Sequence, residues 1–209
     1  MNSTAQKNEL IFSYSSGILG DAKSLLVSMY LHLNSNASKN ASIFDNMLGN
    51  QLFDTEDKAP KNLKFTDCIG ENTISKKIPK NTNTPLSEII GDIKDIKWKS
   101  VFKGFSEYVL PIKDNDKIKL IKMDAGTAVP LHSHNGKEYI LVIDGSFCDE
   151  YGEYSKGDLQ INDHNIRHHP TACKKEGCVC LSITENDVVF YGPFAPILNL
   201  FTFVKSFLK

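Results

Sequence analysis

The spacing of apolar residues in the first 55 positions predicts three short helices. The first covers residues 9–16 and ends near Gly17, because glycine is a common residue at helix C-termini. The second begins at Asp21, a residue type that caps helix N-termini. The third covers residues 41–52. Each helix is too short to be stable alone in water, so each must pack its apolar stripe against a partner.

The remainder of the chain predicts a linker followed by β-structure. Residues 54–84 are polar and rich in Lys, Asn and Pro, which is typical of a linker. A short helix is expected after Pro85. From Trp98 onward, short runs of β-branched and aromatic residues alternate with turn residues such as Asp144-Gly145. This pattern predicts a sandwich or a jelly-roll barrel, so the expected fold class is α+β.

Composition excludes several classes of protein. The 209 residues carry a formal net charge of -1, which gives no basic footprint for binding nucleic acid. No apolar run approaches the roughly 20 residues that span a bilayer, and the N-terminus does not resemble a signal peptide. An odd number of cysteines without an export signal indicates reduced thiols in the cytoplasm. The five are Cys68, Cys148, Cys173, Cys178 and Cys180.

The segment from Gly126 to Gly145 predicts a metal site. His132 and His134 are two residues apart, so in a strand their side chains lie on the same face. Glu138 follows at another even step, after the turn pair Asn135-Gly136. If the chain reverses there, Glu138 opens the neighbouring strand and faces both histidines. Two imidazoles and a carboxylate suit Fe(II), Mn(II), Ni(II) or Zn(II).

A fourth ligand is expected from another strand, and the candidates are His164, His168 and His169. The last two are adjacent and face opposite ways in a strand, so at most one points inward. A His-x-His pair alone is more often a hydrogen-bonded pair than a metal site. Here the carboxylate at the correct phase, the intervening turn and the flanking glycines favour a metal.

These residues resemble a known family. Gly126-x5-His132-x-His134-x3-Glu138-x6-Gly145 is similar to the first cupin motif at every spacing, whereas the second cupin motif is degenerate. The surrounding segments MDAGTAVPLHSH, VIDGSFCDEYGEYSKGD, GCVCLSIT and FYGPFAPILNLF resemble the ChrR family of anti-sigma factors. That resemblance implies a helical anti-sigma-like domain with a polar linker in residues 1–80. It implies a cupin (jelly-roll β-barrel) domain in residues 81–209, with His168 as the remaining metal ligand.

The N-terminal half also resembles this family, including Tyr14 and Gly17 of its Tyr-x-x-Gly sequence. In the family this domain binds an extracytoplasmic-function sigma factor and holds zinc through His-x3-Cys-x2-Cys. Here Tyr30, Asn34 and Ala37 occupy the corresponding positions. A structural zinc site needs several thiolate or imidazole ligands, so we expect an N-terminal domain without metal.

The resemblance implies a cytoplasmic transcriptional regulator that responds to oxidative or other stress. Its cupin domain would bind one divalent metal, with zinc favoured and iron, manganese or nickel as alternatives. The expected partner is an extracytoplasmic-function sigma factor, without direct contact to nucleic acid or membrane. Cupin barrels commonly pair through exposed strands, which allows a homodimer. The alternatives are a dioxygenase-like cupin metalloenzyme and a cupin whose metal only stabilises the barrel.

Two cysteines and two possible supporting residues complete the candidate chemistry. Cys178 and Cys180 share one face of a predicted strand, where a direct disulfide would be strained. We interpret them as buried small apolar residues rather than as an oxidation sensor. Glu107 and Tyr139 are candidates for hydrogen bonds to the ligand imidazoles, although ordinary surface or core roles are favoured for both.

Overall fold

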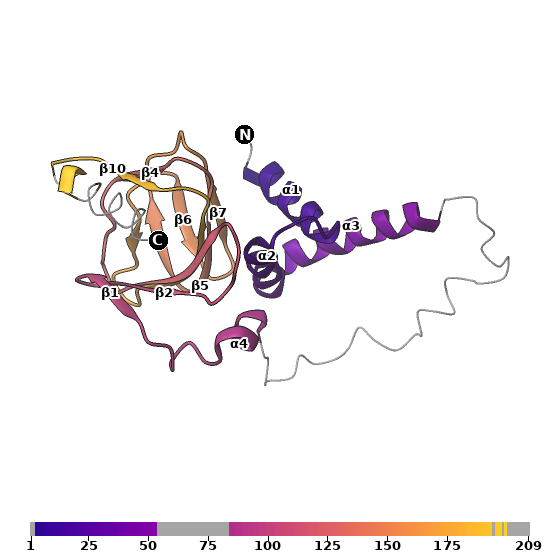
Figure 1. Ribbon diagram of the computed structural model, residues 1–209, viewed down its shortest axis with the longest axis horizontal. Coiled ribbons are helices and arrows are strands. Elements are labelled where there is room, and N and C mark those ends of the chain that lie inside the picture. Colours follow the sequence, from indigo (N-terminus) through magenta and orange to yellow (C-terminus); the bar gives the residue numbers. More distant parts are fainter. Residues whose placement is uncertain (1–2, 54–83, 194, 198, 200–209) are drawn as a thin grey trace.

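The computed structural model describes residues 3–53, 84–193, 195–197 and 199. Helices lie beside a β-barrel, and the barrel is built from the C-terminal half of the chain (Figure 1). The expected domain boundary at residues 80–81, and nearly all of the expected linker, lie outside the described residues. None of the helices in the described part is long and apolar enough to cross a membrane. The helices are α1 (Ser3–Ser15), α2 (Asp21–Leu33), α3 (Ser35–Phe53) and α4 (Pro85–Ile90).

Two helix starts differ from the sequence prediction. Helices α1 and α3 both begin about six residues earlier than their apolar stripes indicated. The first turns of α3 are almost entirely polar, so they carry no hydrophobic period. Asn34 supplies the missing signal, because its side-chain oxygen accepts a hydrogen bond from the Ala37 N–H at 3.1 Å and caps α3.

The N-terminus of α2 is capped from the barrel. The prediction that Asp21 caps this helix was wrong, since Asp21 is its first residue and Gly20 holds the cap position without a side chain. Instead, Asp114 Oδ2 accepts a hydrogen bond from the Ala22 N–H at 2.8 Å. A Cβ atom on Gly20 would lie 2.7 Å from that same oxygen. Glycine at position 20 therefore makes room for the distant cap.

The barrel combines a large antiparallel sheet with a small one. The large sheet has the order β1-β2-β3-β9-β5-β6, with β7 and β8 also paired to β5, and β10 pairs with β4 to form the second sheet. The strands are β1 (Lys99–Phe102), β2 (Phe105–Val109), β3 (Lys117–Met123), β4 (His132–His134), β5 (Glu138–Asp149), β6 (Gly152–Ser155), β7 (Leu159–Asn162), β8 (Thr171–Ala172), β9 (Cys178–Thr184) and β10 (Val188–Phe190). The predicted α+β fold class is confirmed.

Strand β5 closes the barrel because it bends along its length. The pair Asp144-Gly145, predicted as a turn, lies inside this strand instead. The register with β9 shifts between Val142 and Asp144, and Gly145 adopts a φ of 69°. A bulge of this kind kinks a strand without ending it. The first part of β5 therefore pairs with β7, and the second part pairs with β6 and β8.

One hydrophobic core joins the helices to the barrel. Leu26 of α2 is fully buried in the same cluster as Leu141 of β5 and Leu181 of β9. Helix α2 packs on these two strands, and Figure 1 shows it next to the barrel. The approach is close at the helix C-terminus, where a Cβ atom on Gly157 would lie 2.9 Å from the Leu33 carbonyl oxygen. The helical region is therefore part of the folded body of the protein.

Polar contacts reinforce this packing next to the predicted metal site. Lys23 Nζ of α2 lies 2.9 Å from Glu185 Oε1 and 3.0 Å from Asp116 Oδ2. Burial lowers the pKa of Lys23, but its hydrogen bonds to both carboxylates outweigh that effect and raise the pKa overall. Glu185 Oε2 also accepts a hydrogen bond from the Lys137 N–H at 3.0 Å. These contacts tie α2 to the residue that precedes Glu138.

Candidate metal centre

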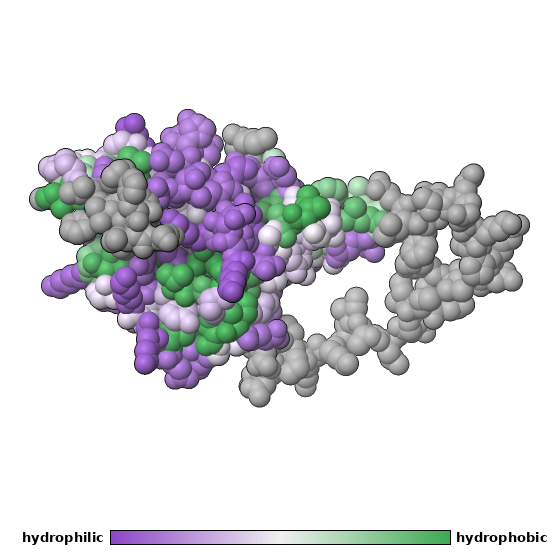
Figure 2. Space-filling model, viewed as in Figure 1, coloured by the Kyte–Doolittle hydropathy of each residue, from purple (hydrophilic) through white to green (hydrophobic). Residues whose placement is uncertain are grey.

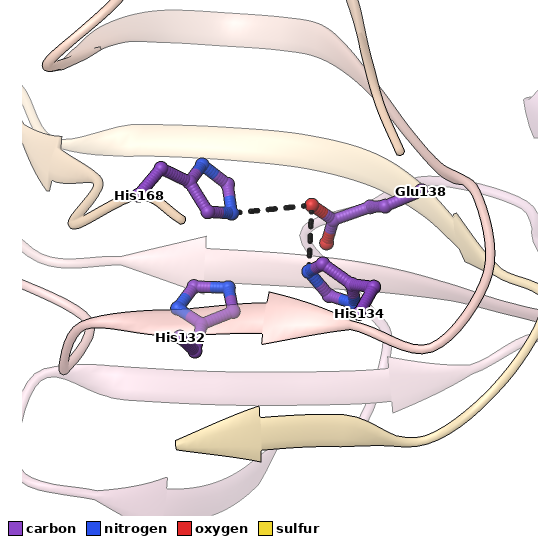
Figure 3. Close-up of side chains that lie close together, drawn as sticks. All are labelled: His132, His134, Glu138 and His168. Atoms are coloured by element: carbon purple, nitrogen blue, oxygen red, sulfur yellow. Dashed lines mark ion pairs between the residues drawn. The ribbon is translucent and has the colours of Figure 1, made fainter. Parts of the chain in front are cut away.

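Four side chains from separate parts of the barrel meet in its interior. His132 and His134 stand on β4, and Glu138 is the first residue of β5. His168 lies between β7 and β8, where its backbone exchanges two hydrogen bonds with that of His132, at 3.1 and 3.0 Å. All four residues are buried, with at most 5% of their surface exposed. Figure 3 shows their polar ends pointing toward a common centre.

The spacing of the donor atoms fits one metal ion. One donor atom from each of the four residues can be chosen so that all lie within 4.8 Å of one another. His134 Nε2 is 3.0 Å from Glu138 Oε2, and His168 Nε2 is 3.4 Å from the same oxygen. Ligands held about 2.0–2.2 Å from a shared zinc ion have comparable separations. Within the described residues, this is the group that brings together at least three such ligands.

The ligands converge by a route that differs from the prediction. Strand β4 was expected to lie beside β5 after a reversal at Asn135-Gly136. Instead β4 pairs with β10, in the register His134 to Val188. Glu138 pairs with Thr184 of β9 and Asn162 of β7. The histidines and the glutamate therefore approach one another across the barrel rather than along one sheet.

Hydrogen bonds orient two of the three imidazoles. His132 Nδ1 lies 2.8 Å from the Pro130 carbonyl oxygen, and His168 Nδ1 lies 3.1 Å from Asp149 Oδ2. Both oxygens accept, so each Nδ1 carries the proton that it donates and each Nε2 is left to bind a metal. Asn162 Nδ2 donates to Glu138 Oε2 at 3.2 Å and fixes the carboxylate.

Buried atoms without hydrogen bonds support the presence of a ligand at this centre. Neither ring nitrogen of His134, nor Nε2 of His168, has a hydrogen-bond partner among the described residues. Two of these nitrogens lie within ion-pair distance of Glu138, but the angles do not meet hydrogen-bond geometry. Buried polar atoms without partners cost free energy, and coordination to a metal would satisfy them. The residues therefore fit a divalent metal ion.

The charges of the site also suit a cation. Burial, partly opposed by Glu138, lowers the pKa of His132 to about 4, so its imidazole is neutral near pH 7. Burial disfavours the charged form of Glu138, but its close contacts with the imidazoles of His134 and His168 outweigh that effect and hold the pKa of Glu138 well below the ordinary value. Burial likewise opposes protonation of His168, yet Asp149 and Glu138 raise its pKa to about 9. A metal ion would take the place of that proton.

Asp149 is a supporting residue that sequence reasoning missed. Its side chain is fully buried, and its Oδ2 accepts hydrogen bonds from His168 and, at 2.7 Å, from Gln160 Nε2. Tyr139, one of the two candidates for this role, directs its hydroxyl to Glu185 at 3.4 Å instead. Glu107, the other, lies 3.5 Å from Lys119 Nζ. No local motif marks Asp149, because it is 19 residues from His168.

Replacing Asp149 with Asn is expected to weaken metal binding by about 10- to 100-fold, because the acceptor that orients and polarises His168 loses its charge. Competition with a chromophoric chelator would measure the change. Asp163→Asn, on the loop before His168, is the matched control and should leave affinity unaltered. Equal affinities for Asp149→Asn and the wild type would show that Asp149 does not support the centre.

The remaining predicted candidates fall outside the cluster. The side chains of His164 and His169 are exposed, in agreement with the choice of His168. Cys178 and Cys180 are both buried, as expected, with sulfur atoms 3.3 Å apart. Contact with Cys178, together with burial, raises the pKa of Cys180 well above its ordinary value. Its thiol is therefore protonated near neutral pH and is a poor nucleophile.

The positions that would carry zinc ligands in the helical region serve other purposes. Tyr30 and Ala37 are buried in the hydrophobic core. The Asn34 side chain caps α3 and also donates a hydrogen bond to the Gly157 carbonyl oxygen at 3.1 Å. These residues hold the helices together and against the barrel. A metal-free helical domain remains a prediction.

This arrangement of helices and a cupin-like barrel is similar to that of known proteins. Residues 86–186 match the family model of the ChrR cupin-like domain. The anti-sigma-E factor ChrR of Cereibacter sphaeroides is 28% identical over 197 residues, covering 90% of this chain and 92% of that protein. The crystal structure of Rhodobacter sphaeroides SigE in complex with the anti-sigma ChrR matches with a TM-score of 0.70 and 28% identity. That match covers 85% of this chain and 96% of the other.

The match with ChrR includes both the helices and the barrel, because it extends over nine-tenths of each protein. The barrel carries the four converging side chains, and the family model covers His132, His134, Glu138 and His168. This chain therefore carries a ChrR cupin-like domain in residues 86–186 and is similar to ChrR through both its helices and its barrel.

Proposed function

We propose that this protein is a cytoplasmic anti-sigma factor of the ChrR type. Its helical region binds an extracytoplasmic-function sigma factor. Its cupin domain binds one divalent metal ion, with zinc favoured, through His132, His134, Glu138 and His168, and responds to a stress signal. The observation that carries the proposal is the similarity to ChrR through both regions, at 90% coverage of this chain.

The helices present an apolar surface that suits a protein partner. Ile43 and Met47 lie one turn apart on α3 and are 56% and 54% exposed. Phe12 of α1 is 41% exposed and meets Phe44 of α3 edge to face, with ring centroids 5.6 Å apart. We call these four residues the α1–α3 surface. Figure 2 shows hydrophobic residues along α3 where it extends away from the barrel. Exposed apolar clusters of this kind commonly mark protein interfaces.

A continuous chain of contacts connects the metal centre to helix α2. Lys137 precedes the ligand Glu138, and its N–H donates to Glu185. Glu185 in turn pairs with Lys23 of α2, beside α1 and α3. A change at the centre that moves the start of β5 would therefore alter the contacts of α2. This supports a regulator in which the barrel controls partner binding by the helices.

Sigma-factor binding is expected to fail when the α1–α3 surface is charged. Ile43→Asp combined with Met47→Asp should reduce recovery of extracytoplasmic-function sigma factors from the native organism by at least about tenfold, because buried apolar anchors dominate interface energies. Co-purification with the tagged full-length protein, followed by mass spectrometry, measures this. Val109→Asp, a 66% exposed position on the barrel, is the matched control and should not reduce recovery.

The recovery of sigma factors is compared between different metal and redox states of the protein. Recovery should be measured for metal-loaded, chelated and oxidised protein, because a stress signal is expected to release the partner. If no sigma factor is recovered under any of them, the anti-sigma function is wrong. Recovery that is equal for the wild type and the Ile43→Asp, Met47→Asp variant would leave the function in place and exclude the α1–α3 surface.

A cupin metalloenzyme of the dioxygenase type is the second candidate. The observation in its favour is an apolar cavity that opens onto the ligand set, where a substrate and O2 can reach the metal. Apart from the ligand set, the cavity wall includes the ion pair of Lys119 with Glu107 at 3.5 Å. Oxygen consumption by the iron-loaded protein with small diketone or thiol substrates would separate this candidate from the regulator.

A further inference from the structure

The barrel encloses a cavity that neither the metal site nor partner binding explains. Its volume is about 510 Å³, within the range of cavities that bind small organic molecules. His132, His134 and Glu138 lie on its wall, whereas His168 does not line it. A metal held by the four residues would therefore be accessible from the cavity.

The walls away from the ligands are mostly hydrocarbon. They are formed by side chains from several strands, chiefly Phe105, Ile121, Met123, Ile140, Phe147 and Phe190. Several of these belong to the second core cluster and are at most 8% exposed. Val101 and Phe102 of β1, which are 45% and 38% exposed, also line the cavity and form its rim. An apolar body would be desolvated on entering, which favours its binding.

The polar groups of the cavity indicate which chemical group a bound molecule would place next to the metal-binding residues. A divalent ion together with the Glu138 carboxylate carries a single positive charge toward the cavity. Asp149 lies behind His168 and is not on the wall. The lysine on the wall, Lys119, is already paired with Glu107. The ion would thus be the electrophilic group at one end of an apolar chamber, with Asp149 shielded from the cavity behind His168, so an anionic oxygen beside the ion would be attracted to it more strongly than in water.

We propose that the barrel cavity binds a small aliphatic or aromatic molecule with one anionic oxygen-donor end, such as a medium-chain monocarboxylate. Its apolar body occupies the space between β1, β3 and β5, and its oxygen coordinates the metal from the open side. This inference rests on the proposed function, since it names the class of ligand that the cupin domain of the regulator recognises.

Decanoate and decanol are the matched probes, because they differ only in the head group. Calorimetric titration of the zinc-loaded full-length protein is expected to give saturable one-to-one binding of decanoate. Decanol should bind about tenfold more weakly. After chelation of the metal, the two probes should bind equally. Equal binding of both probes to the loaded protein, or no saturable binding of decanoate, would overturn the inference.

Filling the cavity tests the location of the bound molecule. Ile121→Trp places a large ring inside it and is expected to weaken decanoate binding by about tenfold or more. Val101→Trp narrows the rim without changing a buried residue, so it gives the same test if Ile121→Trp fails to fold. Val109→Trp, on the outside of the neighbouring strand β2, should bind decanoate as the wild type does. Binding that neither cavity variant weakens would also overturn the inference.

Zinc content and sigma-factor recovery are measured on the same samples. A protein that holds zinc and recovers its partner but does not bind decanoate would refute the ligand class and leave the proposed function intact. A protein that holds no zinc would refute the metal centre itself, before any ligand is considered.

Discussion

The combined variant His132→Ala, His134→Ala is expected to purify with almost no metal, whereas the native protein carries about one ion per chain. The variant keeps only Glu138 and His168, and two protein ligands are fewer than the three or four that hold zinc in proteins. Element analysis of protein purified without added metal measures both contents. Because the ion binds the folded barrel only, an ion at a thousand times its dissociation constant adds about 4 kcal/mol of stability. For a chain of this size that corresponds to roughly 8–16 °C in melting temperature.

The control for this variant changes the same residue types at the same number of positions. His164→Ala combined with His169→Ala removes the two exposed histidines near the site. This control should retain full metal content and lose thermal stability on chelation, as the native protein does. A double His132, His134 variant that still holds one ion per chain would require a different set of ligands. Two tightly bound ions per chain would contradict the expectation of a metal-free helical region.

Replacing Leu26 with Ala is expected to cost about 2–5 kcal/mol of unfolding free energy. Leu26 is fully buried, and it lies in the cluster that α2 shares with β5 and β9. The cavity left behind sits between the helices and the barrel. Chemical denaturation should show a lower midpoint, and the melting temperature should fall by roughly 6–12 °C for a loss of ~3 kcal/mol.

Ile18→Ala serves as the control, since Ile18 is 71% exposed between α1 and α2. Its stability should stay within about 0.5 kcal/mol of the native value. If Leu26→Ala proved as mild as Ile18→Ala, α2 would not be part of the core described above. The route from Glu185 and Lys23 to the helices would then lack its structural basis.

The sequence predicted that the side chains of the candidate metal centre would cluster because their signals are local. His132, His134 and Glu138 lie within seven consecutive residues, and strand periodicity alone places the two histidines on one face. The choice of His168 over His164 and His169 needed the family resemblance, and the structure agrees with it. The proposed route of convergence was wrong, because the pairing of β4 with β10 depends on residues more than 50 positions away.

Features that depend on long-range contacts were not predictable in this way. Asp149 and Asn162 support the ligands from positions that carry no motif. Asp114 caps α2 across 92 residues, so the local sequence suggested Asp21 instead. The pair Asp144-Gly145 has turn chemistry, yet β9 pairs with β5 on both sides of it and keeps the strand continuous. For the cap of α2 and for Asp144-Gly145, tertiary contacts override the local preference of the sequence.

The most direct test of the metal centre is X-ray absorption at the metal edge of the native protein. The arrangement described here predicts a shell of nitrogen and oxygen scatterers, with three imidazoles and a carboxylate at about 2.0–2.2 Å for zinc. It predicts no sulfur, because the cluster of converging side chains contains no cysteine and Cys178 and Cys180 contact each other instead. A sulfur shell near 2.3 Å, or fewer than three imidazoles, would contradict it.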